Sequence, residues 1–198
     1  MPESRVTKQT NEKGHSYLQG QLLIAMPGLA DPYFEHSVTL ICQHNTEGCF
    51  GLTINKPIEL NINSLFDQLE IHSDNSEINE MPVYRGGPVQ IEQGFVIHDS
   101  DNKWENTFTI SEGLAVTASK DILTDIANGT GPDNFILTLG SASWAPGQME
   151  QEILNNSWLN CPIDKKIIFN TLSEDRWQTA ADSLGFDVNF ISEIAGHD

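Results

Sequence analysis

Positively charged side chains are scarce in this 198-residue chain, which has 10 Lys and Arg against 28 Asp and Glu and a formal net charge of −18 at pH 7. No Lys or Arg occurs between Lys13 and Lys56. Proteins bind duplex DNA largely by neutralising its phosphates with Lys and Arg. The composition therefore argues against direct binding of nucleic acid.

Long apolar segments are also missing, because the longest aliphatic run is Leu22–Met26 and a membrane-spanning helix needs about 18 apolar residues. The first fifteen residues have mixed charge and lack the apolar core of a secretory signal. The three cysteines, an odd number in a chain of this size, suit a reducing compartment. We expect a cytoplasmic protein that does not bind membranes.

The common catalytic motifs are absent from the sequence. It contains no G-x-G-x-x-G after a strand, no G-x-x-x-x-G-K-[ST], no G-x-S-x-G, no H-E-x-x-H and no C-x-x-C. Dinucleotide-binding, P-loop and common hydrolase sites therefore have no support. We predict no cofactor, and no reaction can be named.

The acidic residues are concentrated in one part of the chain. Between Glu59 and Glu112 there are eleven acids against two bases, Arg85 and Lys103, so this stretch carries half of the net charge. Such a run is typical of a solvated surface that keeps a protein soluble. A docking surface for a basic partner is the alternative.

The hydrophobic pattern predicts short strands mixed with short helices. Strands are expected at Leu22–Met26, Val38–Gln43, Phe50–Asn55, Met81–Arg85, Gly94–His98, Thr107–Ile110, Leu114–Thr117, Phe135–Leu139 and Ile167–Phe169. Helices are expected at Asn61–Leu69, Lys120–Asn128, Pro146–Asn155 and Ser173–Ser183, with a polar loop at Ser73–Glu80. The sequence thus predicts a polar arm over residues 1–16 and one α+β domain over residues 17–198.

Four potential metal ligands cluster near the second predicted strand: His36, Cys42, His44 and Cys49. The two-residue period of a strand would place Cys42 and His44 on one face, near enough to share an ion. The predicted strands Val38–Gln43 and Phe50–Asn55 are expected to form a hairpin, because turn-forming residues separate them. A reversible disulfide between Cys42 and Cys49 across this hairpin is a second option. Buried thiols and hydrogen-bonded histidines are more common than either, so we predict no metal site.

The segment Gly140–Glu152 is the densest in polar and small residues. A strand that ends in small residues, followed by a tight loop and a helix, presents free N–H groups, and Ser143 lies beside that point. Glu150 and Glu152 cannot converge on one atom because they are two residues apart on a helix, whereas Gln148 and Glu152 share a face.

A structural role for this segment is favoured over a ligand pocket. Trp144 is expected to pack in the core, and the polar side chains are expected to satisfy backbone groups.

Two turns have residue patterns that restrict the backbone. In Asp31–Phe34 the aspartate can accept from backbone N–H groups two residues on, and Phe34 is a candidate core anchor. Gly86-Gly87-Pro88 follows Arg85 and leaves room for another chain or a small anion to approach closely. Both turns are most simply scaffolding.

Several of these segments together resemble the AlgH/YqgE family of bacterial proteins. The resemblance rests on LIAMPGLADPYFEHSVTLICQHNTEGCFGLTINKP, YRGGPV, GFVIHD and LTLGSASWAPGQMEQEILNNSWL, and it covers about Leu22 to His197. It implies a compact α+β domain of coiled, bifurcated, mostly antiparallel sheets packed against a few helices. It implies no reaction, although the family name carries a genetic link to transcriptional control of alginate production.

The family motif maps onto a defined set of positions. These are Asp31, Pro32, Phe34, Asn55, Lys56, Pro57, Gly86, Gly87, Pro88, Gly140, Trp144, Gly147, Gln148, Glu150, Glu152 and Trp158. Cys49 and Cys161 lie outside it, which weakens the disulfide and the four-ligand metal site.

Two hypotheses about function remain. The first is a cytosolic, non-enzymatic regulatory or interaction protein that acts through a protein partner and not by touching DNA. The second is a small-ligand binder or enzyme with a site between Gly140–Glu152, Asp31–Phe34 and Gly86–Pro88, because sites commonly lie on loops of a rigid scaffold. The candidate site residues are Asp31, Arg85, Gly87, Ser143, Trp144, Gln148 and Glu152.

Overall fold

A branched β-sheet forms the centre of the computed structural model, which describes residues 17–99, 101–185 and 187–188. Its strands are β1 (Gln21–Ala25), β2 (Val38–Asn45), β3 (Gly48–Thr53), β4 (Pro57–Asn61), β5 (Pro82–Arg85), β6 (Val89–His98), β7 (Thr107–Ser111), β8 (Leu114–Thr117), β9 (Phe135–Trp144) and β10 (Trp158–Pro162). Its helices are α1 (Ile62–Gln68), α2 (Ser76–Asn79), α3 (Lys120–Ala127), α4 (Gln148–Leu154), α5 (Arg176–Asp182) and the π-helix η1 (Lys166–Asn170). The arm predicted over residues 1–16 lies outside the described residues, so the division into arm and domain stays a prediction.

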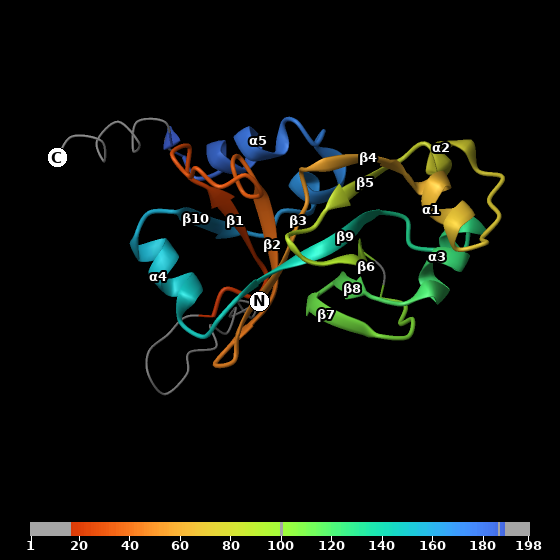
Figure 1. Cartoon of the computed structure of the whole chain (residues 1–198), viewed down its shortest axis with the longest axis horizontal. Coiled ribbons are helices and arrows are strands. Elements are labelled where there is room, and N and C mark those ends of the chain that lie inside the picture. Colours follow the sequence, from red (N-terminus) through yellow and green to blue (C-terminus); the bar gives the residue numbers. More distant parts are fainter. Residues whose placement is uncertain (1–16, 100, 186, 189–198) are drawn as a thin grey trace, which may run out of the picture.

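Strand β9 joins the two halves of the sheet. The main strand order is β10-β1-β2-β3-β9-β6-β8-β7, and β5, which carries β4 on its other edge, pairs with β9 outside this path. The β5–β9 pairing is parallel, whereas β9 pairs with β3 and β6 in antiparallel register. Figure 1 shows β9 crossing from the half that contains β1–β3, α4 and α5 to the half that contains β6–β8 and α1–α3. The predicted α+β class is confirmed.

Both faces of β1 are buried. Leu22 and Ile24 pack in one cluster with Trp177 of α5, and Leu23 packs on the other face with Met149 of α4. Neighbouring residues of a strand point to opposite faces, so an apolar run without alternation is what a strand covered on both sides requires. Helices therefore cover this half of the sheet on two sides.

The other half of the sheet has its own apolar cluster. Phe66 of α1 and Ile122 and Ile126 of α3 pack against Val83 of β5 and Val96 of β6. None of the helices in the described part of the chain is long and apolar enough to cross a membrane.

Strand β9 corrects one prediction from the sequence. The segment Gly140–Trp144, which we expected to be a loop, continues the strand, and Ser143 pairs with Phe50 of β3. Gly140 has φ 77°, so the strand changes direction at a residue that adopts this conformation without strain. β4 and β10 are further strands that the sequence did not predict.

The strand predicted at Ile167–Phe169 is also wrong, because this segment lies in η1. The carbonyl of Asp164 accepts from the N–H groups of Ile167 (3.0 Å) and Ile168 (3.2 Å), and its Oδ1 accepts from Lys166 N–H (2.8 Å). These bonds start a helical turn, and burial of both isoleucines outweighs their preference for strands.

The polar loop predicted at Ser73–Glu80 contains the single-turn helix α2. The side chain of Asn75 accepts from the N–H groups of Glu77 and Ile78, which caps the turn.

Candidate functional site

The Asp31 turn places two aromatic side chains in different surroundings. As the sequence predicts, Asp31 Oδ1 accepts from the backbone N–H groups of Tyr33 (2.8 Å) and Phe34 (3.1 Å). The Phe34 ring packs against Trp144 and Trp158, with centroid distances of 5.9 and 5.3 Å. Tyr33 is instead 43% exposed and lies in a surface groove.

The groove combines apolar walls with one charged side chain. It has a volume of about 620 Å³ and is lined by Pro32, Tyr33, Ile58, Arg85, Gly87, Ile91 and Leu139. The Arg85 guanidinium carbon lies 5.8 Å from the centroid of the Tyr33 ring, a cation–π arrangement. Volumes of this size suit a small molecule or a short stretch of peptide.

A bulge in β6 exposes apolar side chains beside the groove. Val89 pairs with Ser141 and Gly94 pairs with Leu139. The chain therefore moves five residues along β6 while it moves only two along β9. The extra residues leave the plane of the sheet. Ile91, at the centre of the bulge, is 65% exposed.

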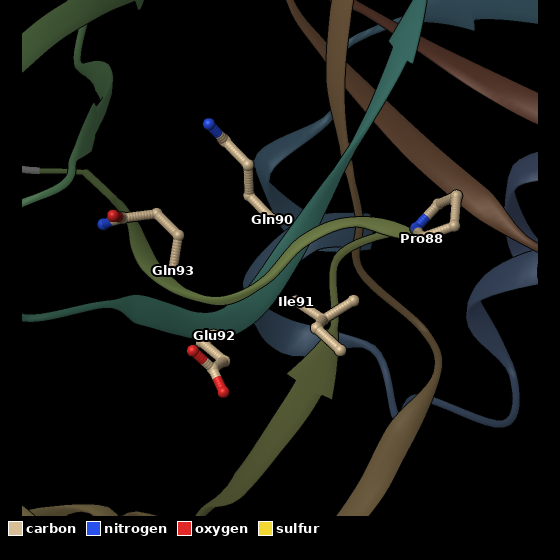
Figure 2. A pocket seen from close by; sticks show the side chains of 5 residues that line it. All are labelled: Pro88, Gln90, Ile91, Glu92 and Gln93. Carbon is tan, nitrogen blue, oxygen red and sulfur yellow. The ribbon is translucent and has the colours of Figure 1, made fainter.

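Figure 2 shows how the bulge breaks the alternation of side chains along β6. Gln90 and Gln93 point to one side, and Ile91 and Glu92 point to the other. Gln90 has φ 49°, a conformation that few residues other than glycine adopt. A second depression of about 630 Å³ is lined by Pro88 and residues 90–93.

Close contact between two backbones explains the glycines of the groove. A Cβ on Gly86 would lie well inside 3.0 Å of the Gly140 carbonyl oxygen, and one on Gly87 would do the same at the Ser141 carbonyl. The Gly86 N–H donates to the carbonyl of Leu139 at 2.8 Å. The space that the sequence left open for another chain is therefore filled by β9 of this chain.

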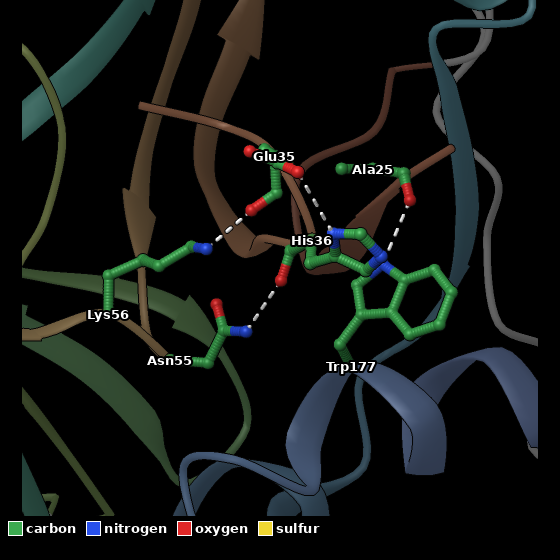
Figure 3. Close-up of polar contacts among 6 residues, drawn as sticks. All are labelled: Ala25, Glu35, His36, Asn55, Lys56 and Trp177. Atoms are coloured by element: carbon green, nitrogen blue, oxygen red, sulfur yellow. Dashed lines mark hydrogen bonds and ion pairs between the residues drawn. The ribbon is translucent and has the colours of Figure 1, made fainter. Parts of the chain in front are cut away.

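Polar contacts hold the loop that follows the Asp31 turn (Figure 3). Asn55 Oδ1 accepts from Val38 N–H at 2.7 Å, and Asn55 Nδ2 donates to the His36 carbonyl at 2.9 Å. Lys56 Nζ donates to the carbonyl of Glu35. The family motif residues Asn55 and Lys56 thus fix the shape of this loop.

The same loop is attached to α5. The rings of His36 and Trp177 meet at a centroid distance of 4.9 Å, and Trp177 Nε1 donates to the Ala25 carbonyl at 2.9 Å. Figure 3 shows His36 above the indole. The loop is therefore held from both sides.

Lys56 and Arg85 are two neighbouring cations in a protein with a net charge of −18. Burial lowers the pKa of Lys56, the charge of Glu35 opposes that shift, and the charge of Arg85 adds to it. In the described part of the chain, neither cation has a carboxylate oxygen within 4 Å. An anionic group in the groove would relieve the repulsion between them.

Trp144, Gln148 and Glu152 belong to a structural cluster. Glu152 Oε2 accepts from the indole N–H groups of Trp144 (3.0 Å) and Trp158 (2.8 Å), and its Oε1 accepts from Gln148 Nε2 at 2.8 Å. Gln148 Oε1 in turn accepts from Ala145 N–H at 2.9 Å. These residues join α4 to β9 and β10. The core position of Trp144 and the bond between Gln148 and the backbone agree with the structural interpretation of this segment, whereas the Glu152 carboxylate bonds to side chains and not to the backbone.

His44 is hydrogen-bonded on both ring nitrogens. Its Nδ1 accepts from Leu18 N–H at 3.1 Å, so its Nε2 carries the proton and donates to Glu150 Oε1 at 3.1 Å. The strand register shifts between Ile41 and Gln43, so the strict alternation expected for this strand does not hold. Within the described residues, no three His, Cys, Asp or Glu side chains are grouped to hold a metal ion.

The three cysteines are free and buried. Burial raises the pKa of Cys49 to about 12, with a further rise from the charge of Glu150. Burial also raises the pKa values of Cys42 and Cys161. These thiols have little thiolate at neutral pH, and thiolate is the nucleophilic form.

The structure divides the predicted site residues between two places. Arg85 and Gly87 line the groove, with Asp31 holding the turn beside it. Trp144, Gln148 and Glu152 lie in the indole cluster, and Ser143 is exposed on β9. Phe34 connects the two places through its contact with Trp144.

Sequence reasoning did not select Tyr33, Ile91 or Lys56 as site residues. An apolar side chain that faces solvent cannot be distinguished from a core residue by its type. Lys56 belongs to the family motif, which was the one signal that singled it out. The groove depends on a bulge whose position follows from pairing with a distant strand.

Comparison with known proteins places this arrangement in a family. The model of the AlgH-like family matches residues 22–189, which include the groove and the indole cluster. The chain belongs to the AlgH-like family.

Relatives of similar length match this chain over most of its sequence. A UPF0301 protein of Methylococcus capsulatus is 45% identical over 181 residues, covering 91% of this chain and 96% of the relative. A UPF0301 protein of Thioalkalivibrio sulfidiphilus is 46% identical over 182 residues, covering 92% and 97%.

Two solved structures share the AlgH-like fold. The solution structure of the AlgH protein from Pseudomonas aeruginosa has a TM-score of 0.76 and 39% identity, covering 97% of this chain and all of that one. A crystal structure from Corynebacterium diphtheriae has a TM-score of 0.64 and covers 86% of this chain and 87% of its own. At 22% identity, the second likeness concerns the fold alone.

Proposed function

We propose that this AlgH-like protein is a cytoplasmic, non-enzymatic regulatory or interaction protein that binds a protein partner in the groove beside the β6 bulge. The observation that carries the proposal is the exposed apolar surface of the groove. Tyr33 and Ile91, which line the groove, are 43% and 65% exposed, and Val89, at the start of the bulge beside it, is 41% exposed. Exposed apolar side chains around a hollow are typical of binding surfaces.

The charges at the groove indicate what the partner presents. Arg85 lines the groove, and Lys56 lies close enough for the charge of Arg85 to lower its pKa. A partner segment with an apolar side chain and a carboxylate would contact Ile91 and Tyr33 while pairing with Arg85. The occupant that fits is therefore a peptide segment with an Asp, a Glu or a free carboxyl terminus next to an apolar residue.

Peptide selection tests this docking directly. The purified full chain is used to select from a displayed library of random linear peptides, with Ile91→Asp and Arg85→Gln as groove variants. Leu154→Asp is the matched control, because Leu154 is 75% exposed and lies on α4. We expect peptides that join an apolar residue to a carboxylate, bound about tenfold more weakly or worse by both groove variants.

Two results would contradict the docking proposal. One is a failure to enrich any sequence with the folded wild-type protein. The other is enrichment of peptides that bind the groove variants and the Leu154 variant equally well. Circular dichroism of each variant checks that its fold is intact.

A regulatory role for this protein should not involve direct contact with DNA. Its net charge of −18 opposes approach to a phosphate backbone. Mobility-shift assays of the purified protein at physiological salt should leave promoter DNA unshifted. A sequence-specific shift by the protein alone would overturn this part of the proposal.

A further inference from the structure

Arg176 is a buried cation with few partners. It is 4% exposed and stands at the start of α5. Its Nη1 donates to the Ile54 carbonyl, and its guanidinium carbon lies 5.1 Å from the centroid of the Tyr84 ring. Its Nε is buried and makes no hydrogen bond within the described part of the chain.

Within the described residues, the charge of Arg176 has no anionic partner. Across residues 17–99, 101–185 and 187–188, no carboxylate oxygen lies within 4 Å of its guanidinium. Burial of a charged group is costly unless an opposite charge and hydrogen bonds compensate for it. A carbonyl and an aromatic face supply only part of that compensation.

Arg176 lines a cavity of about 310 Å³. One wall consists of apolar side chains from α1, β5 and β9, including Ile62, Tyr84 and Leu137. The end of η1 and the segment that follows it also line the cavity, with Asn170 and Thr171. The cavity thus joins an apolar wall, one cation and a polar edge.

We propose that this cavity binds a small monocarboxylate with a short apolar body, whose carboxylate pairs with Arg176. A guanidinium has five N–H donors in a planar fork that matches a carboxylate, and the described structure uses one of them in a hydrogen bond. The volume lies at the lower end of the range for small-molecule sites, so a single ring or a short chain fits. One cation in apolar surroundings favours a ligand with one negative charge.

A purely structural role is the competing explanation for Arg176. In that case its bond to Ile54 and its position over Tyr84 would serve only to hold α5 on β5 and on the residue that follows β3. Such a role does not require a cavity beside the guanidinium. Ligand binding accounts for that cavity, because a carboxylate there would supply the opposite charge.

The test uses nuclear magnetic resonance of the ¹⁵N-labelled full chain titrated with hexanoate and with benzoate. We expect saturable shifts of the Arg176 Nε–H signal and of the backbone amides of Thr171 and Tyr84 for at least one of the two probes. The neutral amides hexanamide and benzamide should bind about tenfold more weakly, because they lack the charge that pairs with the guanidinium.

Variants separate this site from the groove. Arg176→Gln should abolish the shifts, and Arg85→Gln, in the groove, should leave them unchanged. If Arg176→Gln does not fold, the shift of the Arg176 Nε–H signal in the wild-type protein still shows whether the acids bind beside Arg176. The proposal is overturned if neither acid gives a saturable shift of Arg176 Nε–H, or if the amides bind as well as the acids.

Discussion

Glu152 shows how one carboxylate can order a whole group of aromatic side chains. Its two oxygens accept from both indole N–H groups of the cluster and from Gln148. Trp144 and Trp158 are 4% and 2% exposed, so few alternative partners are available to their N–H groups. The acidic motif that ends the Gly140–Glu152 segment therefore serves packing.

Removing this carboxylate should destabilise the fold. Glu152→Ala leaves two nearly buried indole N–H groups without an acceptor, and each such loss costs about 1–3 kcal/mol. We expect the free energy of unfolding to fall by roughly 2–4 kcal/mol in urea titrations. Gln151→Ala is the control, since Gln151 is exposed and its side chain bonds only to Asn155. Equal stability of the two variants would contradict the assigned role of Glu152.

Because its thiols are buried, the protein should become less stable to unfolding at alkaline pH. In the folded protein burial raises the pKa of Cys49 from 9.0 to about 12. Between those values the unfolded chain loses this proton while the folded chain keeps it, so the contribution of Cys49 is fully present below pH 9 and is lost as pH rises toward 12. Urea unfolding of the wild type should therefore show a steeper decline above pH 9 than that of Cys49→Ser.

Thiol labelling is a second test of the burial of the cysteines. All three cysteines should resist 5,5′-dithiobis(2-nitrobenzoic acid) at neutral pH and should react once urea unfolds the chain, because all three are buried. Rapid reaction of Cys49 in the native protein would contradict the shift in its pKa.

Among the elements, the link between β5 and β6 passes very close to β9. Gly86 has no room for a side chain, because its Cβ would meet the backbone of Gly140. Backbone atoms of a packed sheet cannot move aside as a flexible side chain can. The link therefore requires glycine for steric reasons.

Replacement of Gly86 should be severe. Gly86→Ala is expected to lower the free energy of unfolding by at least about 3 kcal/mol, as overpacking of a rigid contact does. Gly28→Ala is the matched control, since nothing lies within 4 Å of a Cβ at Gly28 and we expect little change there. Thermal unfolding followed by circular dichroism compares them, and similar melting temperatures would argue against the close contact.

Local sequence predicted those elements whose shape depends on neighbours in the chain. The hairpin of β2 and β3 follows from the turn residues between apolar strands, and α1 follows from Asn61, whose side chain caps it at Ser64 N–H (2.9 Å). The end of β9 could not be predicted, because Gly140 and Ser143 are small polar residues that suggest a loop. They lie in a strand because β3, β5 and β6 pair with it from distant parts of the chain.

For the candidate site too, the sequence predicted the local features but not those that depend on tertiary packing. The turn chemistry of Asp31 and the two glycines after Arg85 are local features, and the structure places both turns at one groove. The exposure of Tyr33 and Ile91 depends on tertiary packing, so their types alone gave no indication. The buried position of Arg176 likewise depends on contacts with Ile54, just after β3, and with Tyr84 of β5.

At the scale of the whole molecule, the charge is poorly compensated. In the described part of the chain no Lys or Arg side chain lies within 4 Å of a carboxylate oxygen, and the contacts of that kind join histidines to carboxylates: His36 to Glu35 (3.8 Å), His44 to Glu150 (3.1 Å) and His72 to Asp74 (3.0 Å). With a net charge of −18, repulsion between carboxylates opposes the folded state.

Salt should therefore stabilise this protein. Raising NaCl from about 10 mM to about 150 mM shortens the Debye length from ~30 Å to ~8 Å and screens repulsion across the surface. We expect the melting temperature measured by calorimetry to rise over this range, with most of the gain at the low end. A melting temperature that falls with added NaCl would show that attractive pairs dominate.

The pairing of β1 with β10 has a consequence for synthesis on the ribosome. Gln21 of the first strand lies opposite Pro162 of the last, and β9 supplies partners for β3, β5 and β6. The pairing of β1 with β10 therefore cannot form until residue 162 has left the exit tunnel. Nascent chains should stay sensitive to protease until β10 emerges, and the apolar strands made first must be kept from aggregating during that interval.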